Sequence, residues 1–506
     1  MTPQELGNRK WWALGALALS LMVVGLDLTV LNVALPTLAT DLHASTGQLQ
    51  WFADAYNLVL AAALLPAGML GDRFGRRRML LIALSLFGAA SLACSFASSA
   101  GELIAGRAVL GLGAAALMPL SMAVLPVLFT PAERPRALTI WITANSLGIP
   151  LGPIVGGWLL DHYHWGAVFL INVPVVLIGL VAIAFLLPES RNPRPARIDV
   201  PGVIASSLGL VGITYGVIEG GDNGWGDPLT LLALAVGAAS LAGFVAWQRR
   251  TDHPLVDLAL FRSPGFTWGG ILATLSTFAM FGVLFAMPQY FQAVIGADAL
   301  GTGLRLLPVI GGLLAGAQLA DRVAPRLGAP RTVALGFGLL AAALLAGATT
   351  QSSSGYGFAA AWMAVIGAGL GFALPSAMDA AIGALSPERS GVGSALLMAM
   401  RSVGGTIGVA VLGTVLGSAY RGALDAGGAP AAARESVSAG VQLAHELGSS
   451  ELLHSVRSAF VEGMDAMLWV CGGVAVVGLV LALRFLPRRA AAADPLAGAA
   501  ESAHAA

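Results

Sequence analysis

Charged side chains are scarce in this chain. Only 11% of its 506 residues are Asp, Glu, Lys or Arg, while 57% are hydrophobic. A soluble domain carries about 25% charged residues, so the composition excludes a soluble globular protein. The formal net charge is zero, and no basic patch with interleaved aromatic residues occurs, so nothing favours nucleic acid as a partner. The composition predicts an integral membrane protein.

Lysine and cysteine are almost absent. Lys10 is the only lysine, so the phosphate-binding pattern G-x-x-x-x-G-K-[ST] cannot occur. Cys94 and Cys471 lie in separate apolar runs, and no His/Cys spacing suits a metal ion, so we expect neither a disulfide nor a metal site. We therefore predict no cofactor and no enzymatic activity.

Long apolar windows, in contrast, recur along the chain. The first follows Arg9 and Lys10 as in a signal peptide, but it continues to Pro36 without a small-residue cleavage site, so we interpret it as an uncleaved span. An all-α integral membrane protein with fourteen spans is predicted, each near the length of about 20 residues that crosses a bilayer. The windows lie near 12–35, 48–70, 79–98, 103–128, 137–160, 165–187, 200–218, 229–248, 267–294, 302–321, 332–350, 356–382, 393–419 and 464–487.

Arginine is distributed unevenly between the two sets of loops. Alternate short loops such as "TDLHASTGQ" and "TQSSSG" carry none, with Arg305 as an exception to the bias. The positive-inside rule places the basic loops and both termini in the cytoplasm. The loop 421–463 is then outside, and its apolar residues at helical spacing predict one or two surface helices. The basic loops carry Arg73, Arg76, Arg77, Arg78, Arg134, Arg136, Arg191, Arg194, Arg197, Arg249, Arg250, Arg262, Arg322, Arg326, Arg331, Arg389, Arg488 and Arg489.

The two ends of the chain repeat each other. "GLGAAALMPLSMAVLPVLFTPAER" matches "GAGLGFALPSAMDAAIGALSPER" at an offset of 256 residues, which aligns Pro119 with Pro375 and Pro131 with Pro387. We therefore predict two homologous six-span bundles whose interface at the membrane midplane holds a substrate site, a transporter architecture. The bundles would comprise residues 1–198 and 251–490, with a two-span insert at 199–250 and a disordered cytoplasmic tail at 491–506.

Four motifs carry a resemblance to a known family. They are "LDLTVLNVALP" (26–36), "GMLGDRFGRRRML" (68–80), "LIAGRAVLGLGAA" (103–115) and "GIPLGPIVGG" (148–157). In these motifs the chain resembles the major facilitator superfamily, and within it the fourteen-span drug:proton antiporters that export drugs, quaternary ammonium compounds and antibiotics. It departs from the family's pattern at Thr139, often a glycine, and at Trp165-Gly166-Ala167, where many relatives have Trp-Arg-Trp. These departures weaken any transfer of substrate preference.

Three charged residues inside apolar runs are the candidates for proton coupling. Asp27 lies about fifteen residues into the first span, where an acid costs about 2.5–3.5 kcal/mol. Either it alternates between a proton and a cationic substrate, or it makes a structural hydrogen bond to a neighbouring helix. Asp54 is expected in the outer half of the second span, as a second binding acid or as an interfacial acid in water. Arg107 needs an acid or carbonyl partner if it is buried. The resemblance implies a part in proton transfer, with a structural anchor as the alternative.

Candidate substrate-binding residues are Asp27, Asp54, Tyr56, Asn145, Phe285 and Asp379. Asp379 is the only acid well inside the apolar runs of the second bundle, but it lies toward the cytoplasmic end, where an exposed acid costs little. Tyr56 and Phe285 suit an adaptable apolar cavity, with ordinary packing as the alternative. Asn145 and its repeat partner Arg401 are both expected to face the cavity.

Two groups of residues are candidates for gating. The resemblance implies that Asp72 and Arg73, with Arg76 beside them, form a charge lock that holds the outward-open state. The alternative is that these charges only set the orientation of the chain by the positive-inside rule. Small residues at every fourth position, Gly148, Gly152 and Gly156, form one stripe for close helix packing, and Pro153 predicts a bend.

The resemblance therefore implies a proton-coupled antiporter of the bacterial cytoplasmic membrane that exports lipophilic, cationic drugs or antibiotics. Its expected partners are the small-molecule substrate, protons and membrane lipids, without nucleic acid, and we expect a monomer. Two alternatives stay open: an exporter of a single natural product, and a proton-coupled symporter of a metabolite.

Overall fold

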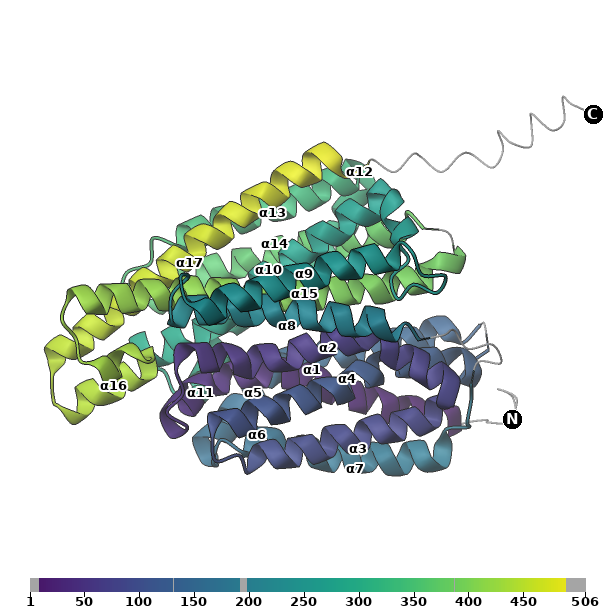
Figure 1. The fold of residues 1–506 in the computed structure, drawn as a ribbon, viewed down its shortest axis with the longest axis horizontal. Coiled ribbons are helices and arrows are strands. Elements are labelled where there is room, and N and C mark those ends of the chain that lie inside the picture. The colour runs from purple at the N-terminus through teal and green to yellow at the C-terminus, as the bar shows by residue number, and fades with distance from the viewer. Residues whose placement is uncertain (1–8, 131, 192–197, 386, 488–506) are drawn as a thin grey trace, which may run out of the picture.

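A computed structural model describes residues 9–130, 132–191, 198–385 and 387–487, and this part of the chain is helical without strands (Figure 1). Pro131, Arg194, Arg197, Arg488, Arg489 and the predicted tail 491–506 lie outside these residues. The first bundle comprises α1 (Arg9–Asp41), α2 (Thr46–Phe74), α3 (Arg76–Ser95), α4 (Ala100–Leu128), α5 (Arg134–His162), α6 (Ala167–Leu170) and α7 (Asn172–Leu186).

The insert comprises α8 (Val200–Asp222) and α9 (Pro228–Gln248). The second bundle comprises η1 (Leu258–Arg262), α10 (Pro264–Gln289), the π-helical turn η2 (Tyr290–Val294), α11 (Ala299–Arg305), α12 (Leu307–Leu327), α13 (Ala329–Gly347), α14 (Tyr356–Ile382), α15 (Pro387–Ala426), η3 (Ala431–Arg434), α16 (Val437–Glu446) and α17 (Ser450–Phe485).

Thirteen candidate spans in the described part are long and apolar enough to cross a membrane. Two of them are interrupted: one between α6 and α7 at Ile171, and one between α11 and α12 at Leu306, next to Pro308 in the first turn of α12. Proline favours the first turn of a helix because it lacks the backbone N–H that would bond to the preceding turn. The 29-residue helix α5, where the sequence predicts the fifth span, is not among the thirteen, so the count of fourteen spans stays a prediction.

The two bundles lie side by side in Figure 1, with the N-terminal helices below and the C-terminal helices above. Helix α8 of the insert packs against α2 of the first bundle and α15 of the second. The repeat is visible in the local structure, because each bundle turns between its second and third spans at a glycine of positive φ. These are Gly75, with φ of 109°, and Gly328, with φ of 78°. Such φ values strain residues that carry a Cβ.

Residues 421–463 project beyond the bundles (left in Figure 1), and we call them the outer extension after their predicted location outside the membrane. Helices α15 and α17 are 40 and 36 residues long, and their ends together with η3 and α16 form this extension. The Tyr420 hydroxyl holds the extension to α15 by donating to the carbonyl oxygens of Ala433 at 2.7 Å and Ser436 at 3.3 Å. One of the surface helices expected in this loop is therefore α16.

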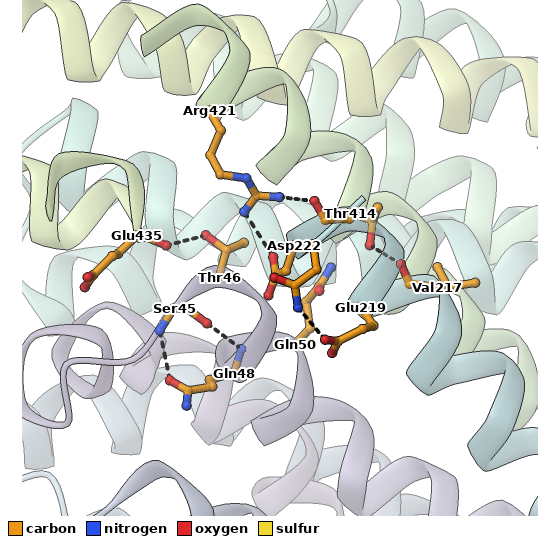
Figure 2. Close-up of polar contacts among 12 residues, drawn as sticks. Ser45, Thr46, Gln48, Gln50, Val217, Glu219, Asp222, Thr414, Arg421 and Glu435 are labelled. Atoms are coloured by element: carbon orange, nitrogen blue, oxygen red, sulfur yellow. Dashed lines mark hydrogen bonds and ion pairs between the residues drawn. The ribbon is translucent and has the colours of Figure 1, made fainter. Parts of the chain in front are cut away.

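Hydrogen bonds between the bundles gather at the end opposite the arginine-rich loops. Thr46 on α2 donates its backbone N–H and its hydroxyl to the Glu435 carbonyl, at 2.9 and 3.0 Å (Figure 2). The Gln50 amide donates to the carbonyl oxygens of Val409 and Ala410 on α15, at 3.3 and 3.2 Å. These bonds close the end opposite the arginine-rich loops, which the sequence predicts to be the outer end.

Further bonds extend the same seal. The Asp161 carboxylate on α5 accepts from the backbone N–H groups of Ala299 and Leu300 at the start of α11, at 3.1 and 3.0 Å. Arg421 on α15 pairs with Asp222 at the end of α8, at 3.1 Å (Figure 2). The seal therefore ties the insert as well as both bundles.

Candidate functional site

A buried ion pair lies in the middle of the first bundle. Arg107 Nη1 donates to Asp27 Oδ2 at 2.6 Å, and the two side chains are 2% and 0% exposed. Arg107 also donates from Nε to the Phe52 carbonyl oxygen at 3.0 Å, and its guanidinium lies 4.5 Å from the centre of the Tyr56 ring. Arg107 thus has both an acid and a carbonyl partner. A buried pair of this kind is costly to break by removing one member.

Asn172 is a residue of this site that the sequence reasoning missed. Its amide donates to Asp27 Oδ1 at 3.4 Å and to the Ser91 hydroxyl at 2.8 Å. The available signal was a lone amide in the apolar run "FLINVPVVLIGL", directly after the break at Ile171. We call Asp27, Arg107, Asn172, Ser91 and Tyr56 the charge cluster.

Asp54 is as buried as Asp27 but differs in its contacts. It is 0% exposed, and neither carboxylate oxygen has a hydrogen-bond partner among the residues that the structure describes. Asp54 lies one helical turn from Gln50, which bonds to α15, and one turn from Asn57. It therefore lies where α2 meets the second bundle. A charged carboxylate is costly there without a partner, so we expect Asp54 to be neutral in this conformation.

A cavity of about 150 Å³ lies between the two bundles. Helices α1, α2, α4, α10 and α15 supply its lining, which is Gly25, Leu28, Thr29, Asn57, Leu60, Leu64, Met118, Thr277, Met280, Phe281, Leu284, Met398, Arg401 and Ser402. We call it the central cavity. Asp27 is not among the lining residues, because its carboxylate points to Arg107. Arg401 is the only charged residue among the described residues of the lining.

Tyr56, Phe285 and Asp379, which were also predicted to bind substrate, are not among the described residues that line the central cavity. Tyr56 belongs to the charge cluster, and Phe285 is fully buried in the packing between the bundles. Asp379 lines a second cavity, of about 950 Å³, at the arginine-rich end, together with Asp321 and Arg331. Asn145 is on α5, and its side chain is outside the described part of the structure.

The predicted gating charges stay within the first bundle. Arg76 pairs with Asp72 at 2.7 Å and donates from Nη1 to the Ala123 carbonyl oxygen of α4 at 3.0 Å. Arg73 lies over the ring of the adjacent Phe74, with 5.6 Å between guanidinium and ring centre. None of these contacts reaches the second bundle among the described residues. The inter-bundle bonds described above therefore lie at the opposite end from these charges.

Glu189 holds the same loop and was not predicted. Its carboxylate accepts the backbone N–H groups of Arg77 and Arg78 at the start of α3, at 3.1 and 3.2 Å. The positive φ of Gly75 disfavours any other residue, and a Cβ atom there would also lie 2.7 Å from Glu189 Oε1. The free N–H groups at a helix N-terminus attract an acid, which fixes the loop on the end of the last span of the first bundle.

The glycine stripe of α5 packs on α1. A Cβ atom at Gly148 would lie 2.8 Å from the Leu26 nitrogen, and one at Gly152 would lie 2.8 Å from the Leu26 carbonyl oxygen. Gly156 faces Val30 one turn further along. The carbonyl of Pro153 faces Gly303 of α11, so α5 also contacts the second bundle. The stripe therefore brings α5 against the turn of α1 that carries Asp27.

We expect Gly152→Val to disrupt the packing of α5 on α1. The added side chain meets the Leu26 carbonyl and the Thr29 side chain, and overpacking of this kind costs about 1–3 kcal/mol or more. Thermal unfolding of the purified protein should shift to lower temperature, and transport should fall. Gly15→Val on α1 is the matched control, because no atom lies within 4 Å of its Cβ position. Equal unfolding temperatures for the two variants would contradict this packing role.

The described helices and the cavity between two repeated bundles define a multi-pass membrane transporter. Residues 17–409 match the family model of the Major Facilitator Superfamily, and the chain belongs to this superfamily. It is 34% identical to the tetracenomycin C resistance and export protein of Streptomyces glaucescens, over 94% of this chain and 92% of that protein. It is 35% identical to the multidrug efflux pump LfrA of Mycolicibacterium smegmatis, over 93% and 96% of the two chains.

Solved structures show the same fold. A bacterial homolog of the human lysosomal transporter Spinster, crystallised in an inward-facing and unoccupied conformation, superposes with a TM-score of 0.69 at 18% identity, covering 96% of this chain and 100% of that one. The predicted all-helical fold of the superfamily is confirmed, and the chain is a transporter rather than an enzyme.

Proposed function

We propose that this protein exports lipophilic drugs or antibiotics across the bacterial cytoplasmic membrane in exchange for protons, and that Asp27 is the acid that couples the two. The buried Asp27–Arg107 pair carries the proposal, because Asp27 is a titratable group inside a candidate span, adjacent to Leu28 and two residues from Thr29 of the central cavity. The names of the relatives, which describe export and resistance, support the drug as cargo.

The two buried acids suggest how protons act. When the outer end opens, a proton that reaches Asp27 neutralises it and releases Arg107 from its counter-ion, although the Phe52 carbonyl and Tyr56 still hold the guanidinium. A proton on Asp54 removes the charge that would oppose closure of the outer interface. When the arginine-rich end opens, loss of the protons to the cytoplasm resets the cycle. If the substrate binds when Asp27 is deprotonated, the proton and the substrate exclude each other. Their transport is then coupled without direct contact between them.

The finer predictions from the sequence are part of the proposal. A lipophilic cation that replaces the proton at Asp27 must displace Arg107, so cation binding is expected to require movement within the charge cluster. Gating at the arginine-rich end is proposed for Asp72, Arg73 and Arg76. A monomer in contact with lipid, with fourteen spans and both termini in the cytoplasm, remains our expectation.

A second candidate function differs from the first only in the number of compounds that the protein exports. One relative is named for a single compound and another as a multidrug pump, at 34% and 35% identity, so an exporter of one natural product is equally compatible with the comparisons. A drug-susceptibility panel in an efflux-deficient host separates them, because a narrow exporter protects against one compound only.

The decisive test uses inside-out membrane vesicles with an acidified lumen and a pH-sensitive dye. Ethidium, methyl viologen and an aromatic polyketide antibiotic are added in turn to vesicles with and without the protein. We expect at least one compound to evoke proton efflux that is absent from control vesicles. Substrate-driven alkalisation of the outer medium, with uptake of both substrate and protons into the lumen, would instead indicate a symporter.

A further inference from the structure

Arg401 in the central cavity has no counter-ion among the described residues. Its side chain lines the cavity from α15, and Nη1 lies 3.5 Å from the Met378 sulfur, its one side-chain contact of hydrogen-bonding type. The Nε atom is buried without any partner. No ion pair within 4.0 Å joins Arg401 to a described carboxylate, so its charge is uncompensated in this conformation.

Arg107 shows what a buried arginine normally requires. It has a carboxylate, a backbone carbonyl and an aromatic ring around one guanidinium. Burying an arginine costs the free energy of its hydration. Without such partners, no ion pair or hydrogen bond offsets this desolvation cost. Arg401 carries five N–H donors in a planar fork that matches two oxygens of one acid group. An anion bound from outside the chain would supply the counter-ion that Arg401 lacks among the described residues.

The rest of the lining favours a particular kind of anion. Among the described residues of its lining there is no acid, and the polar groups other than Arg401 are the neutral side chains of Thr29, Asn57, Thr277 and Ser402. Apolar side chains, including three methionines and Phe281, form the other walls. A cavity of about 150 Å³ accommodates roughly one six-membered ring, as an engineered apolar cavity of that volume binds benzene. Methionine and phenylalanine suit such a ring.

We propose that Arg401 binds an acidic oxygen of the exported compound, namely a carboxylate, phenolate or enolate attached to a ring that the apolar walls enclose. This inference rests on the proposed export function and names its substrate class. A permanent cation without such an oxygen makes no favourable bond to Arg401. The positive charge of Arg401 would also repel it from the cavity.

The test compares three probes with one six-membered ring: benzoate, the neutral benzamide and the cation trimethyl(phenyl)ammonium. Their dissociation constants are measured by calorimetry with the full-length protein in lipid nanodiscs. We expect benzoate to bind about tenfold more tightly than the amide, since hydrogen bonds to an ionised group are the stronger ones. Arg401→Gln should remove this difference, and Arg401→Lys should keep part of it.

Arg305→Gln is the matched control, because Arg305 stacks on Tyr356 outside the central cavity. A benzoate preference that survives Arg401→Gln, or a wild-type preference for the cation, would overturn the inference. If Arg401→Gln does not fold, wild type with the three probes and Arg401→Lys still decide. Proton efflux evoked by a cation in vesicles, without any Arg401-dependent benzoate binding, removes this inference and leaves the proposed function. Arg401-dependent binding of benzoate, without proton efflux evoked by any compound, supports the binding role of Arg401 and removes the proton exchange of the proposed function.

Discussion

Substrate-evoked proton efflux from acid-loaded inside-out vesicles is expected to disappear in the Asp27→Asn variant. Asparagine keeps the size of the side chain but cannot take up or release a proton, so the exchange has no coupling group. The variant also leaves Arg107 without its counter-ion at 2.6 Å, and breaking a buried pair from one side costs about 3–5 kcal/mol. We therefore expect a lower unfolding temperature together with the loss of efflux.

Two further variants separate coupling from folding. Asp41→Asn removes an exposed acid from the end of the same helix and should leave both efflux and stability unchanged. The double variant Asp27→Asn, Arg107→Gln removes both charges and should recover stability without recovering efflux, since the two residues interact directly. Efflux that persists in Asp27→Asn at wild-type protein levels would transfer the coupling role to Asp54.

Asp54→Leu is expected to have the opposite effect on stability. Both oxygens of Asp54 are buried without partners, and an unsatisfied buried polar group costs about 1–3 kcal/mol. Replacing it with an apolar side chain should raise the unfolding temperature while export falls to background. Loss of activity with a gain in stability is the behaviour of a residue kept for function rather than for folding.

The Asp54→Asn variant tests the conformational side of the same proposal. It resembles the protonated acid permanently, so the outer interface should remain closed at every pH. Distances between labels on the outer ends of α2 and α15, measured by double electron–electron resonance, should then be independent of pH. In the wild type we expect a population with longer distances to grow as the pH rises. Identical pH responses in both proteins would remove Asp54 from the gate.

Much of the architecture was predictable because hydrophobic length and charge bias act locally in a membrane protein. The apolar windows, the repeat at an offset of 256 residues and the insert all follow from the sequence pattern alone. The glycine stripe of α5 was predictable in kind, because close helix contacts require small residues. Its partner helix was not, since spacing on one helix says nothing about which neighbour approaches it.

The candidate site was predictable as a set of residues but not as a set of contacts. Asp27 and Arg107 were identified because each is a charge in an apolar run, yet they are 80 residues apart and their pairing requires the packed bundle. Asn172 was missed because a single amide in a span has many structural roles. Arg401 was noticed only as a repeat partner, and its missing counter-ion is a property of the assembled cavity.

The outer extension is predicted to lie outside the cell, where it would give access to the proposed transport cycle. It is built from the second bundle but rests on the first, through the Thr46–Glu435 bonds and a groove of about 480 Å³ between α1 and α16. Opening of the outer end must separate these surfaces. A rigid antibody fragment that bridges α16 and the end of α1 would therefore arrest the molecule in one state without crossing the membrane, and the extension can serve as an inhibitory epitope.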